Sequence, residues 1–402
     1  MVGNLQFNRE QIIVLGATGS IGRQCLDILQ FSFDYELVGV SLNSHFENLE
    51  PYLFYFDSLK YVAITDIKAS EEFKKKHPSY IIFSGENANL ELIKACKDAN
   101  VFNSLIGNCG LLPTLLAIKQ NQDIMLSNKE SLVIGSSLIK KELQNSTSKI
   151  YPVDSEHVAL AKLISHLHRK NIPNSAISKY IVTASGGALR DVKKEDLKNV
   201  TPEQVLKHPT WAMGKKITCD SATLVNKGYE VIEASVLFDI DLDKVGAIIC
   251  RESLVHARIE YYQDNKECKI DEYSPCSMKV PIAYSLSKGH LSMHKNNIED
   301  EENQKKLHFQ DIDYDFYPAF KLTVNTFKKY GNVGMIYFNA VDTLAIDYFL
   351  NHKMSYLQLI SCLDYTYTHL TSLDELREDN LNEIILKAEA FAKVVVENII
   401  NK

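Results

Sequence analysis

Residues 151–157, with the sequence YPVDSEH, place two carboxylates, a hydroxyl and an imidazole close together. If residues 150–153 end a strand, alternation of side chains puts Asp154 and Glu156 on the same side. Two carboxylates on one side repel each other unless a proton or a cation lies between them. Hard divalent cations bind such oxygens. The segment therefore predicts a metal site or, alternatively, a polar loop that caps a helix over residues 158–168.

A second polar group lies in residues 220–234. A helical pattern from about Ala222 places Asn226, Glu230 and Glu233 on one face, because they are spaced i, i+4 and i+7. Such a stripe is commonly an ion-paired helix face. The alternative is that Glu230 is a third oxygen ligand for an ion held by the first two carboxylates.

Several residues near this helix have the types that bind a phosphate group. Ser221 lies just ahead of the expected helix, and Asn226 and Lys227 lie early in it. Ser185 follows an expected strand over residues 179–183 and precedes two glycines, an arrangement that suits an anion or is simply a glycine turn. The set predicts a phosphate site.

The segment from His208 to Gly214 contains the only Trp of the chain, Trp211. It follows an expected helix over residues 201–207. A Trp and a Met in a loop flanked by Pro and Gly suit a lid that covers a substrate and excludes water. The alternative is a loop Trp that packs on its own domain.

A glycine-rich turn follows the first buried strand, residues 11–15. Its glycines, Gly16, Gly19 and Gly22, have the spacing G-x-x-G-x-x-G and precede a helical pattern over residues 24–31. Strand, turn and helix in this order are typical of a dinucleotide-binding fold, in which the helix N-terminus binds the pyrophosphate. A tight strand-to-helix turn without a ligand is the alternative.

The residues after the second expected strand, 35–42, bear on the choice of cofactor. An Asp or Glu there would bind the ribose 2′-hydroxyl of NAD. The chain has Asn43, Ser44 and His45 instead. This favours NADPH, with Ser44 and His45 as contacts to the 2′-phosphate.

Strand and helix patterns alternate from residue 11 to residue 126, which predicts a parallel sheet. Lys129 follows the strand predicted at residues 123–126, in what is expected to be a loop. At the carboxyl end of a strand, its ammonium can meet a substrate oxygen or be solvated. The Pro-bounded segment 275–283 ends the middle region. Helical patterns dominate after a charged stretch at residues 288–306.

Composition limits the classes of protein that remain. The 402 residues are too many for one ordinary core, and 45% hydrophobic with 24% charged residues is typical of globular proteins. A net charge of −7 argues against nucleic acid as a partner. Eight scattered cysteines without a C-x-x-C pair argue against structural zinc and favour reduced thiols. No targeting segment or membrane span is expected, so we predict a cytoplasmic location.

Together these motifs resemble the 1-deoxy-D-xylulose 5-phosphate reductoisomerase family over nearly the whole chain. The resemblance is strongest in residues 16–22, 128–131, 152–157, 185–187, 208–214, 220–234 and 278–283. It implies an α/β fold with a Rossmann-type NADPH domain (1–150), a catalytic domain (151–287), a linker (288–315) and a C-terminal helical bundle (316–402). It also implies a homodimer, a divalent metal (Mg²⁺, Mn²⁺ or Co²⁺) and a small phosphorylated sugar as substrate. The implied reaction converts 1-deoxy-D-xylulose 5-phosphate into 2-C-methyl-D-erythritol 4-phosphate in isoprenoid biosynthesis.

The resemblance also assigns roles to individual residues. The implied metal ligands are Asp154, Glu156 and Glu230. The implied phosphate contacts are Ser185, Ser221, Asn226 and Lys227. The other implied substrate contacts are Lys129, Ser155, His208, Trp211 and Glu233. The residues expected at the cofactor are Gly16, Thr18, Gly19, Ser20, Ile21, Gly22, Ser44, His45, Asn128, Glu130, Met213 and Gly214. Lys129 and Glu233 are candidates for proton handling, without an assignment of acid and base.

The chain departs from the family pattern at three places. Residues 43–45 lack the Gly and the basic residue that the family usually carries. Thr210 and Ala212 stand in the lid where Asn or Ser is expected. Residues 339–342, Asn-Ala-Val-Asp, are a weak form of Asn-Ala-Ala-Asn-Glu.

Two other functions remain as alternatives. A semialdehyde dehydrogenase shares the Gly-Ala-Thr-Gly turn but needs an acylable cysteine beside a histidine. Cys109 is the only cysteine in a suggestive loop. A non-catalytic dinucleotide sensor would have no use for the three carboxylates.

Overall fold

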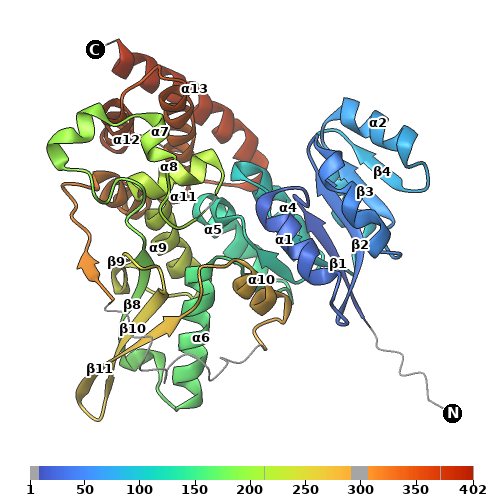
Figure 1. Cartoon of the computed structure of the whole chain (residues 1–402), viewed down its shortest axis with the longest axis horizontal. Coiled ribbons are helices and arrows are strands. Elements are labelled where there is room, and N and C mark those ends of the chain that lie inside the picture. Colours follow the sequence, from blue (N-terminus) through green and yellow to red (C-terminus); the bar gives the residue numbers. More distant parts are fainter. Residues whose placement is uncertain (1–8, 212, 291–306, 372, 402) are drawn as a thin grey trace. The chain divides into compact units, whose positions relative to one another are not determined.

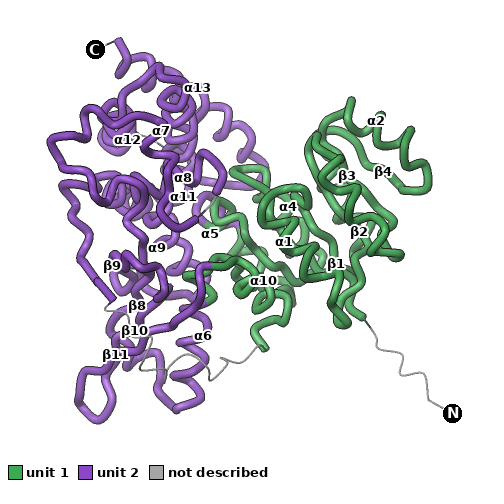
Figure 2. Tube along the Cα trace, viewed as in Figure 1, with its two compact units in different colours: residues 1–132, 139–158, 277–292 green, residues 133–138, 159–276, 293–402 purple. Residues whose placement is uncertain are grey.

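The computed structural model describes residues 9–211, 213–290, 307–371 and 373–401, with the elements labelled in Figure 1. The chain forms two compact units (Figure 2). Unit 1 comprises the described residues within 1–132, 139–158 and 277–292, and unit 2 comprises those within 133–138, 159–276 and 293–402. The chain passes from one unit to the other inside helices α5 (Lys129–Leu143) and α6 (Ser155–Arg169), and again between residues 276 and 277.

Unit 1 is built on a parallel sheet with the strand order β4-β3-β2-β1-β5-β6-β7. The strands are β1 (Glu10–Leu15), β2 (Tyr35–Leu42), β3 (Tyr61–Ile64), β4 (Ile81–Ser84), β5 (Asn100–Asn103), β6 (Ile124–Leu126) and β7 (Ile150–Pro152). The helices between them are α1 (Ser20–Leu29), α2 (Ile67–Lys76), α3 (Ala88–Ala95) and α4 (Leu111–Lys119). Residues 12–15 of β1 are fully buried, as expected for a central strand of a parallel sheet. The predicted Rossmann-type fold is confirmed.

The order of the strands marks the place where folds of this kind bind their ligands. From β1 the chain proceeds outward to β2, β3 and β4, and it then returns to form β5 on the other side of β1. Ligands of such sheets bind outside the carboxyl ends of the strands where the order reverses. The turn after β1 and the loop after β5 flank this position.

Helix α10 (Lys279–Leu286) comes from late in the sequence but belongs to unit 1. Ile282 and Leu286 join the core that contains Leu26 of α1. The hydroxyl of Tyr35 donates to the carbonyl of Leu286 at 2.7 Å. The sequence predicts that this helix belongs to the catalytic domain, residues 151–287. That division into domains stays a prediction.

Unit 2 contains a mixed sheet with the order β11-β10-β8-β9-β12. Its strands are β8 (Ile177–Ala184), β9 (Val245–Cys250), β10 (Val255–Gln263), β11 (Lys266–Tyr273) and β12 (Phe309–Asp311). Strands β8 and β9 are parallel, and the other pairs are antiparallel. The segment between β8 and β9 contains α7 (Pro202–Val205), α8 (Lys215–Thr223) and α9 (Val225–Leu237). Side chains of α6 and α9 form a core with this sheet.

Two parts of unit 2 differ from what the sequence predicted. Strand β11 was not expected, although it forms a hairpin with β10 through Asp264 and Asn265, whose φ angles are 52° and 60°. Strand β12 lies inside the segment predicted as a linker, residues 288–315. Residues 291–306 of that segment lie outside the described residues.

Three C-terminal helices complete unit 2, and the predicted helical character of this region is confirmed, although the segments predicted at residues 318–330 and 340–349 are one helix. They are α11 (Pro318–Leu350), α12 (Tyr356–His369) and α13 (Leu381–Ile400), which pack on one another, and α11 also packs on α8 and α9. Helix α11 is kinked at Gly331, where φ is 57°. Among the described residues, α11 alone has the length and apolar composition of a membrane span, but 61% of its most apolar stretch is buried, as in a core helix.

Candidate active site

Asp154 and Glu156 lie at the start of α6, in unit 1. The expected alternation along a strand is wrong, because β7 ends at Pro152 and Glu156 lies in the first turn of α6. The Oδ1 atom of Asp154 accepts the backbone N–H of Glu156 at 3.2 Å, a contact typical of a helix N-cap. The helix thus begins three residues before the predicted Val158, and its cap carries the candidate ligands.

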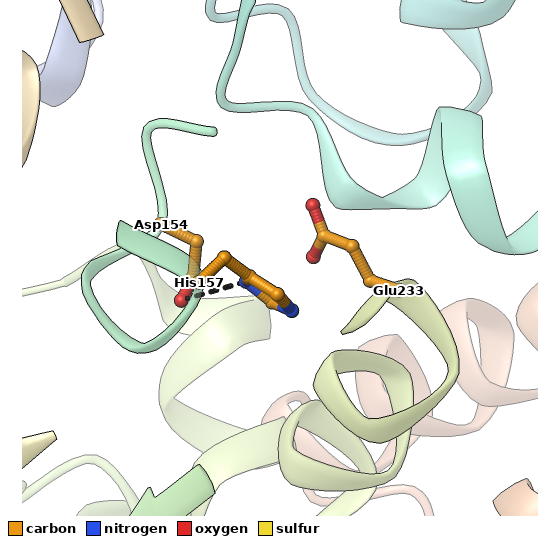
Figure 3. A group of neighbouring side chains, drawn as sticks. All are labelled: Asp154, His157 and Glu233. Atoms are coloured by element: carbon orange, nitrogen blue, oxygen red, sulfur yellow. Dashed lines mark ion pairs between the residues drawn. The ribbon is translucent and has the colours of Figure 1, made fainter. Parts of the chain in front are cut away.

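The two carboxylates have polar partners of their own. The Nζ atom of Lys129 lies 2.8 Å from Asp154 Oδ2. The Nδ1 atom of His157 lies 3.3 Å from Asp154 Oδ1, and Figure 3 shows this pair. The hydroxyl of Ser155 donates to Glu156. His157 is fully buried. A built polar cluster thus surrounds these carboxylates, whereas solvated loop residues would need no such partners.

Lys129 does not lie in a solvated loop. It is the first residue of α5, a helix that the sequence did not predict, and only 8% of the residue is exposed. The side chain of Asn128 caps this helix by accepting the backbone N–H of Ser131 at 3.0 Å. Because its side chain is buried against Asp154, the Lys129 ammonium is held in one place.

Glu230 and Glu233 lie on α9, in unit 2. Glu230 is 2% exposed and accepts hydrogen bonds from Asn226, at 2.5 Å, and from Lys227. Glu233 lies one turn further along α9 (Figure 3), and it is 1% exposed. Buried carboxylates are stable only when paired or bound to a cation. The predicted helical face is confirmed, because Asn226, Glu230 and Glu233 all lie on α9. Lys227 supplies one positive charge next to these carboxylates.

Ser185, His208 and Ser221 lie together within unit 2. The Nε2 atom of His208 is 3.1 Å from the hydroxyl oxygens of both serines. Gly187, with φ of 66°, has no room for a side chain, because a Cβ atom would lie 2.5 Å from the carbonyl oxygen of Ser221. This close approach brings the turn after β8 against α8 and explains the glycine.

Ser221 does not precede the helix, as predicted, but lies within α8. The predicted helix from Ala222 is two helices, α8 and α9, which meet at Leu224. Leu224 has φ of 61° and ψ of 16°, a left-handed conformation that leucine rarely adopts. This single residue changes the direction of the chain between Ser221 and Asn226.

His208 is held in one tautomer. Its Nδ1 atom accepts the backbone N–H groups of Thr210, at 3.1 Å, and Trp211, at 2.9 Å, so the proton is on Nε2. Burial, followed by the positive charge of Arg190, lowers the pKa of His208 to about 4. The ring is therefore neutral at pH 7 and donates a hydrogen bond towards the serines.

The predicted lid is the segment between α7 and α8. The ring of Trp211 contacts His256 of β10 edge to face, with 6.4 Å between the ring centroids. Met213 is half-buried and Gly214 is exposed, whereas Ala212 lies outside the described residues. Helix α7 is shorter than the predicted helix over residues 201–207, so the loop that carries His208 is longer.

Arg190 was not predicted from the sequence as a site residue. One of its terminal nitrogens donates to the carbonyl oxygens of Ser185 and Arg251, both at 2.9 Å. It thereby fixes the turn that carries Ser185. The sequence signal for Arg190 is its position at the end of the glycine turn. This position alone does not distinguish a site arginine from a surface arginine.

The glycine-rich turn of unit 1 fits a pyrophosphate. Gly16 has φ of 76°, and a Cβ atom at Gly22 would lie 2.2 Å from the carbonyl oxygen of Gly16. No side chain caps the first turn of α1 and no acidic residue lies in it. The N–H groups of Ser20, Ile21 and Gly22 have no acceptor within the helix and can bind an anion.

The other expected cofactor residues of unit 1 flank this turn. Asn128 is 1% exposed, and its amide nitrogen donates to the carbonyls of Leu105 and Gly107 and to Glu130. It holds the loop after β5 against the start of α5. After β2, Ser44 is half-buried and His45 is exposed, where both can meet a ligand. Thr18 is half-buried and Gly19 is exposed.

The candidate metal ligands fit a hard divalent cation. Asp154, Glu156 and Glu230 offer only carboxylate oxygens, the donors that Mg²⁺ and Mn²⁺ prefer. Lys129 pairs with Asp154 and Lys227 with Glu230, so each lysine offsets part of the negative charge. The chemistry of this donor set argues against zinc, which favours nitrogen and sulfur.

The chain matches three descriptions of one family. Residues 12–136 match 1-deoxy-D-xylulose 5-phosphate reductoisomerase, residues 150–238 match its C-terminal domain, and residues 273–394 match the DXP reductoisomerase C-terminal domain. The 1-deoxy-D-xylulose 5-phosphate reductoisomerase of Clostridium kluyveri is 36% identical over 391 residues, which are 96% of this chain and 98% of that protein.

Solved structures agree with the sequence match. A crystal structure of DOX-P reductoisomerase in complex with NADPH, fosmidomycin and magnesium has a TM-score of 0.84 at 27% identity and covers 98% of both chains. The Zymomonas mobilis enzyme in complex with NADPH has a TM-score of 0.82 at 28% identity, covering 97% of this chain and 99% of that one. The chain therefore belongs to the 1-deoxy-D-xylulose 5-phosphate reductoisomerase family.

Proposed function

We propose that the chain carries out the reaction of its family with the residues described above. The reaction rearranges 1-deoxy-D-xylulose 5-phosphate and reduces the product with NADPH to 2-C-methyl-D-erythritol 4-phosphate. The observation that carries the proposal is the set of buried or half-buried carboxylates, Asp154, Glu156 and Glu230, each hydrogen-bonded by a neighbouring side chain. A chain that only bound a dinucleotide would have no use for this set.

The three carboxylates are the proposed ligands of one divalent ion. When bound, such an ion would supply Lewis-acid chemistry that stabilises negative charge developing on the substrate oxygens. Lys129 and Lys227 keep the ligands in place through their hydrogen bonds.

The phosphate group of the substrate is the proposed ligand of Ser185, Ser221, Asn226 and Lys227. His208 supports this role. Its neutral ring can donate a hydrogen bond from Nε2, and this atom lies beside the hydroxyl groups of Ser185 and Ser221. A neutral donor can orient a phosphate oxygen without trapping the product through a full charge. Ser155 is proposed as a further substrate contact.

Proton handling is proposed for Lys129 and Glu233. Both are buried, so either can hold a proton at a defined place with little competition from water. The ammonium of Lys129 already donates to Asp154 and can also donate to a substrate oxygen. Trp211 is proposed to cover the substrate and to exclude water while these protons move.

NADPH is the proposed hydride donor, with its pyrophosphate at the first turn of α1. Ser44 and His45 are the proposed contacts to the 2′-phosphate. Asn128, Glu130, Met213 and Gly214 are further proposed contacts of the cofactor. The absence of an acidic residue from positions 43–45 supports the preference for NADPH over NADH.

We also propose a cytoplasmic homodimer. The eight cysteines are free, as in a reducing compartment. Strands β11 and β12 form the two edges of the sheet of unit 2, and an edge strand offers backbone donors and acceptors to another chain. Sedimentation of the purified chain measures the oligomeric state.

The proposal is tested by following NADPH oxidation by the purified chain with 1-deoxy-D-xylulose 5-phosphate and Mg²⁺. We expect turnover that a chelator abolishes and that added Mg²⁺ restores. Asp154→Asn should remove it. Undiminished turnover of Asp154→Asn, or turnover that needs no metal, contradicts the proposal. Equal rates with NADH and NADPH contradict the assignment of Ser44 and His45.

A further inference from the structure

Lys216 lies between two buried carboxylates in unit 2. Its Nζ atom is 2.8 Å from Asp220 Oδ2 and 2.7 Å from Asp342 Oδ2. Asp342 is fully buried and comes from α11, whereas Lys216 and Asp220 lie one turn apart on α8. The cluster therefore joins α8 to α11 inside the protein.

The charges of this cluster do not balance if both carboxyl groups are ionised. Among the described residues, the titratable groups next to the pair include Lys216 and Cys219 on α8 and Tyr229 on α9, whose ring centroid is 5.9 Å from the Lys216 ammonium. Of these, only Lys216 is a cation. One negative charge would thus remain in a buried place, which is strongly unfavourable.

A single proton resolves the imbalance. Among the described residues, the Oδ1 atoms of Asp220 and Asp342 are buried without a hydrogen-bond partner from other groups. Burial, followed by the charge of Asp342, raises the pKa of Asp220 well above its usual range, although Lys216 opposes the shift. Two carboxyl groups that share one proton are a known solution to such crowding.

The position of the cluster connects it to the phosphate site. Lys216 is the second residue of α8 and lies two residues after Gly214, where the lid segment ends. Asp220 precedes Ser221, whose hydroxyl lies beside His208. A displacement of α8 away from α11 would therefore move both the end of the lid segment and a proposed phosphate contact.

We propose that Lys216, Asp220 and Asp342 are positioning residues for phosphate binding, and that the cluster works with one proton shared by the two aspartates. The shared proton keeps α8 on α11, and its loss leaves a second negative charge that pushes Asp220 from Asp342. This inference rests on the proposed function, because it takes Ser221 as a phosphate contact.

Asp342→Asn isolates the role of the proton. Asparagine has nearly the same shape and still offers an oxygen to Lys216, but the cluster then has one ammonium and one carboxylate and needs no proton. Residues 339–342 are also the place where the chain departs from the family motif Asn-Ala-Ala-Asn-Glu. Asp347→Asn, at an exposed position of the same helix, is the matched control.

The first experiment measures the affinity for inorganic phosphate by calorimetry from about pH 6 to about pH 9. We expect the affinity of the unmodified chain and of Asp347→Asn to fall about tenfold more than the ionisation of phosphate itself accounts for. Asp342→Asn should lack this extra fall. Lys216→Met should bind weakly throughout, and Lys216→Arg should restore part of the affinity. The inference is overturned if the phosphate affinity of the unmodified chain shows no extra fall at high pH. It is also overturned if the phosphate affinity of Asp342→Asn still shows that fall.

A second readout does not depend on phosphate or on turnover. Infrared difference spectra between the two pH limits should show a protonated carboxyl group that disappears at high pH and is missing in Asp342→Asn. No such band in the unmodified chain would also overturn the inference. Failure of the proposed function is distinguishable, because it appears as an absence of NADPH oxidation in the unmodified chain while both cluster readouts remain measurable.

The kinetic form of the test separates positioning from general damage. If the chain turns over substrate, loss of the proton should raise KM and leave kcat nearly constant, because the cluster touches no reacting atom. A fall in kcat at constant KM would contradict a positioning role. Circular dichroism of each variant verifies that the fold is retained.

Discussion

The Nε2 atom of His208 lies 3.1 Å from the hydroxyl oxygen of Ser221. Because the other ring nitrogen accepts two backbone N–H groups, the neutral ring is a donor towards Ser221. We predict that His208 titrates with a pKa of about 4, since burial and Arg190 disfavour its charge. NMR titration of ring-labelled protein measures this value. A midpoint near 6.5 would contradict the proposed tautomer and environment.

The same lowered pKa has a consequence for stability. The folded pKa lies below the unfolded value of about 6.5, so the neutral ring contributes stability above that pH. The contribution is lost as pH falls towards about 4. Arg190→Gln should bring the pKa of His208 closer to its usual value, because it removes the nearby positive charge. If the pKa of His208 is the same in this variant as in the unmodified chain, burial alone causes the shift.

Removing one carboxylate ligand should weaken metal binding and turnover together. We predict that Glu156→Gln lowers kcat/KM by more than about 100-fold and weakens Mn²⁺ binding, measured by electron paramagnetic resonance, because a neutral amide is a poor ligand for a hard cation. Glu267→Gln, at an exposed position of β11, is the control and should behave as the unmodified chain. Equal Mn²⁺ affinity in both variants would show that Glu156 is not a metal ligand.

A methyl group at Gly22 should damage cofactor binding. Its Cβ atom would lie 2.2 Å from the backbone oxygen of Gly16, so the turn must deform. We predict that Gly22→Ala weakens NADPH binding more than about tenfold, as measured by NADPH fluorescence. At Gly19 the same added atom would lie 3.2 Å from that oxygen, and Gly19→Ala should weaken binding less. The reverse order would show that the pyrophosphate is not bound at this turn.

Helices α9 and α11 approach closely at Gly228. A Cβ atom there would lie 2.7 Å from the Cβ atom of Thr323, which is fully buried and donates to the carbonyl of Ala319. We predict that Gly228→Ala lowers the free energy of unfolding by about 1–3 kcal/mol through overpacking. Gly246→Ala is the control, because no atom lies within 4 Å of the added group. Thermal unfolding of both variants measures the difference, and an unchanged Gly228→Ala would contradict the packing argument.

Local patterns predicted the elements that depend on neighbours in the sequence. The buried run of β1, its glycine turn and α1 form within residues 10–29, where hydrophobicity and backbone freedom decide the structure. The polar face of α9 was predicted for the same reason, because helical spacing alone aligns Asn226, Glu230 and Glu233. The family resemblance then connected these segments to one reaction.

Contacts between distant residues could not be predicted. Lys129 was expected in a loop, although Asn128 before it is a residue type that commonly caps helices. Its burial depends on Asp154, which comes from another strand end. The break at Leu224 has no sequence signal, since leucine is an unusual residue for a left-handed position. Asp342 meets Lys216 only because α11 folds back on α8.

Leu224 also restricts how the length of the chain can change during evolution. It is the one residue between α8 and α9, and each residue of a helix turns the following side chains by about 100°. An insertion or deletion there would rotate Asn226 and Glu230 away from their present direction. The hairpin turn at Asp264 and Asn265 lies on the surface and has no such restriction. Alignments of related sequences should therefore show gaps at the hairpin and none at Leu224.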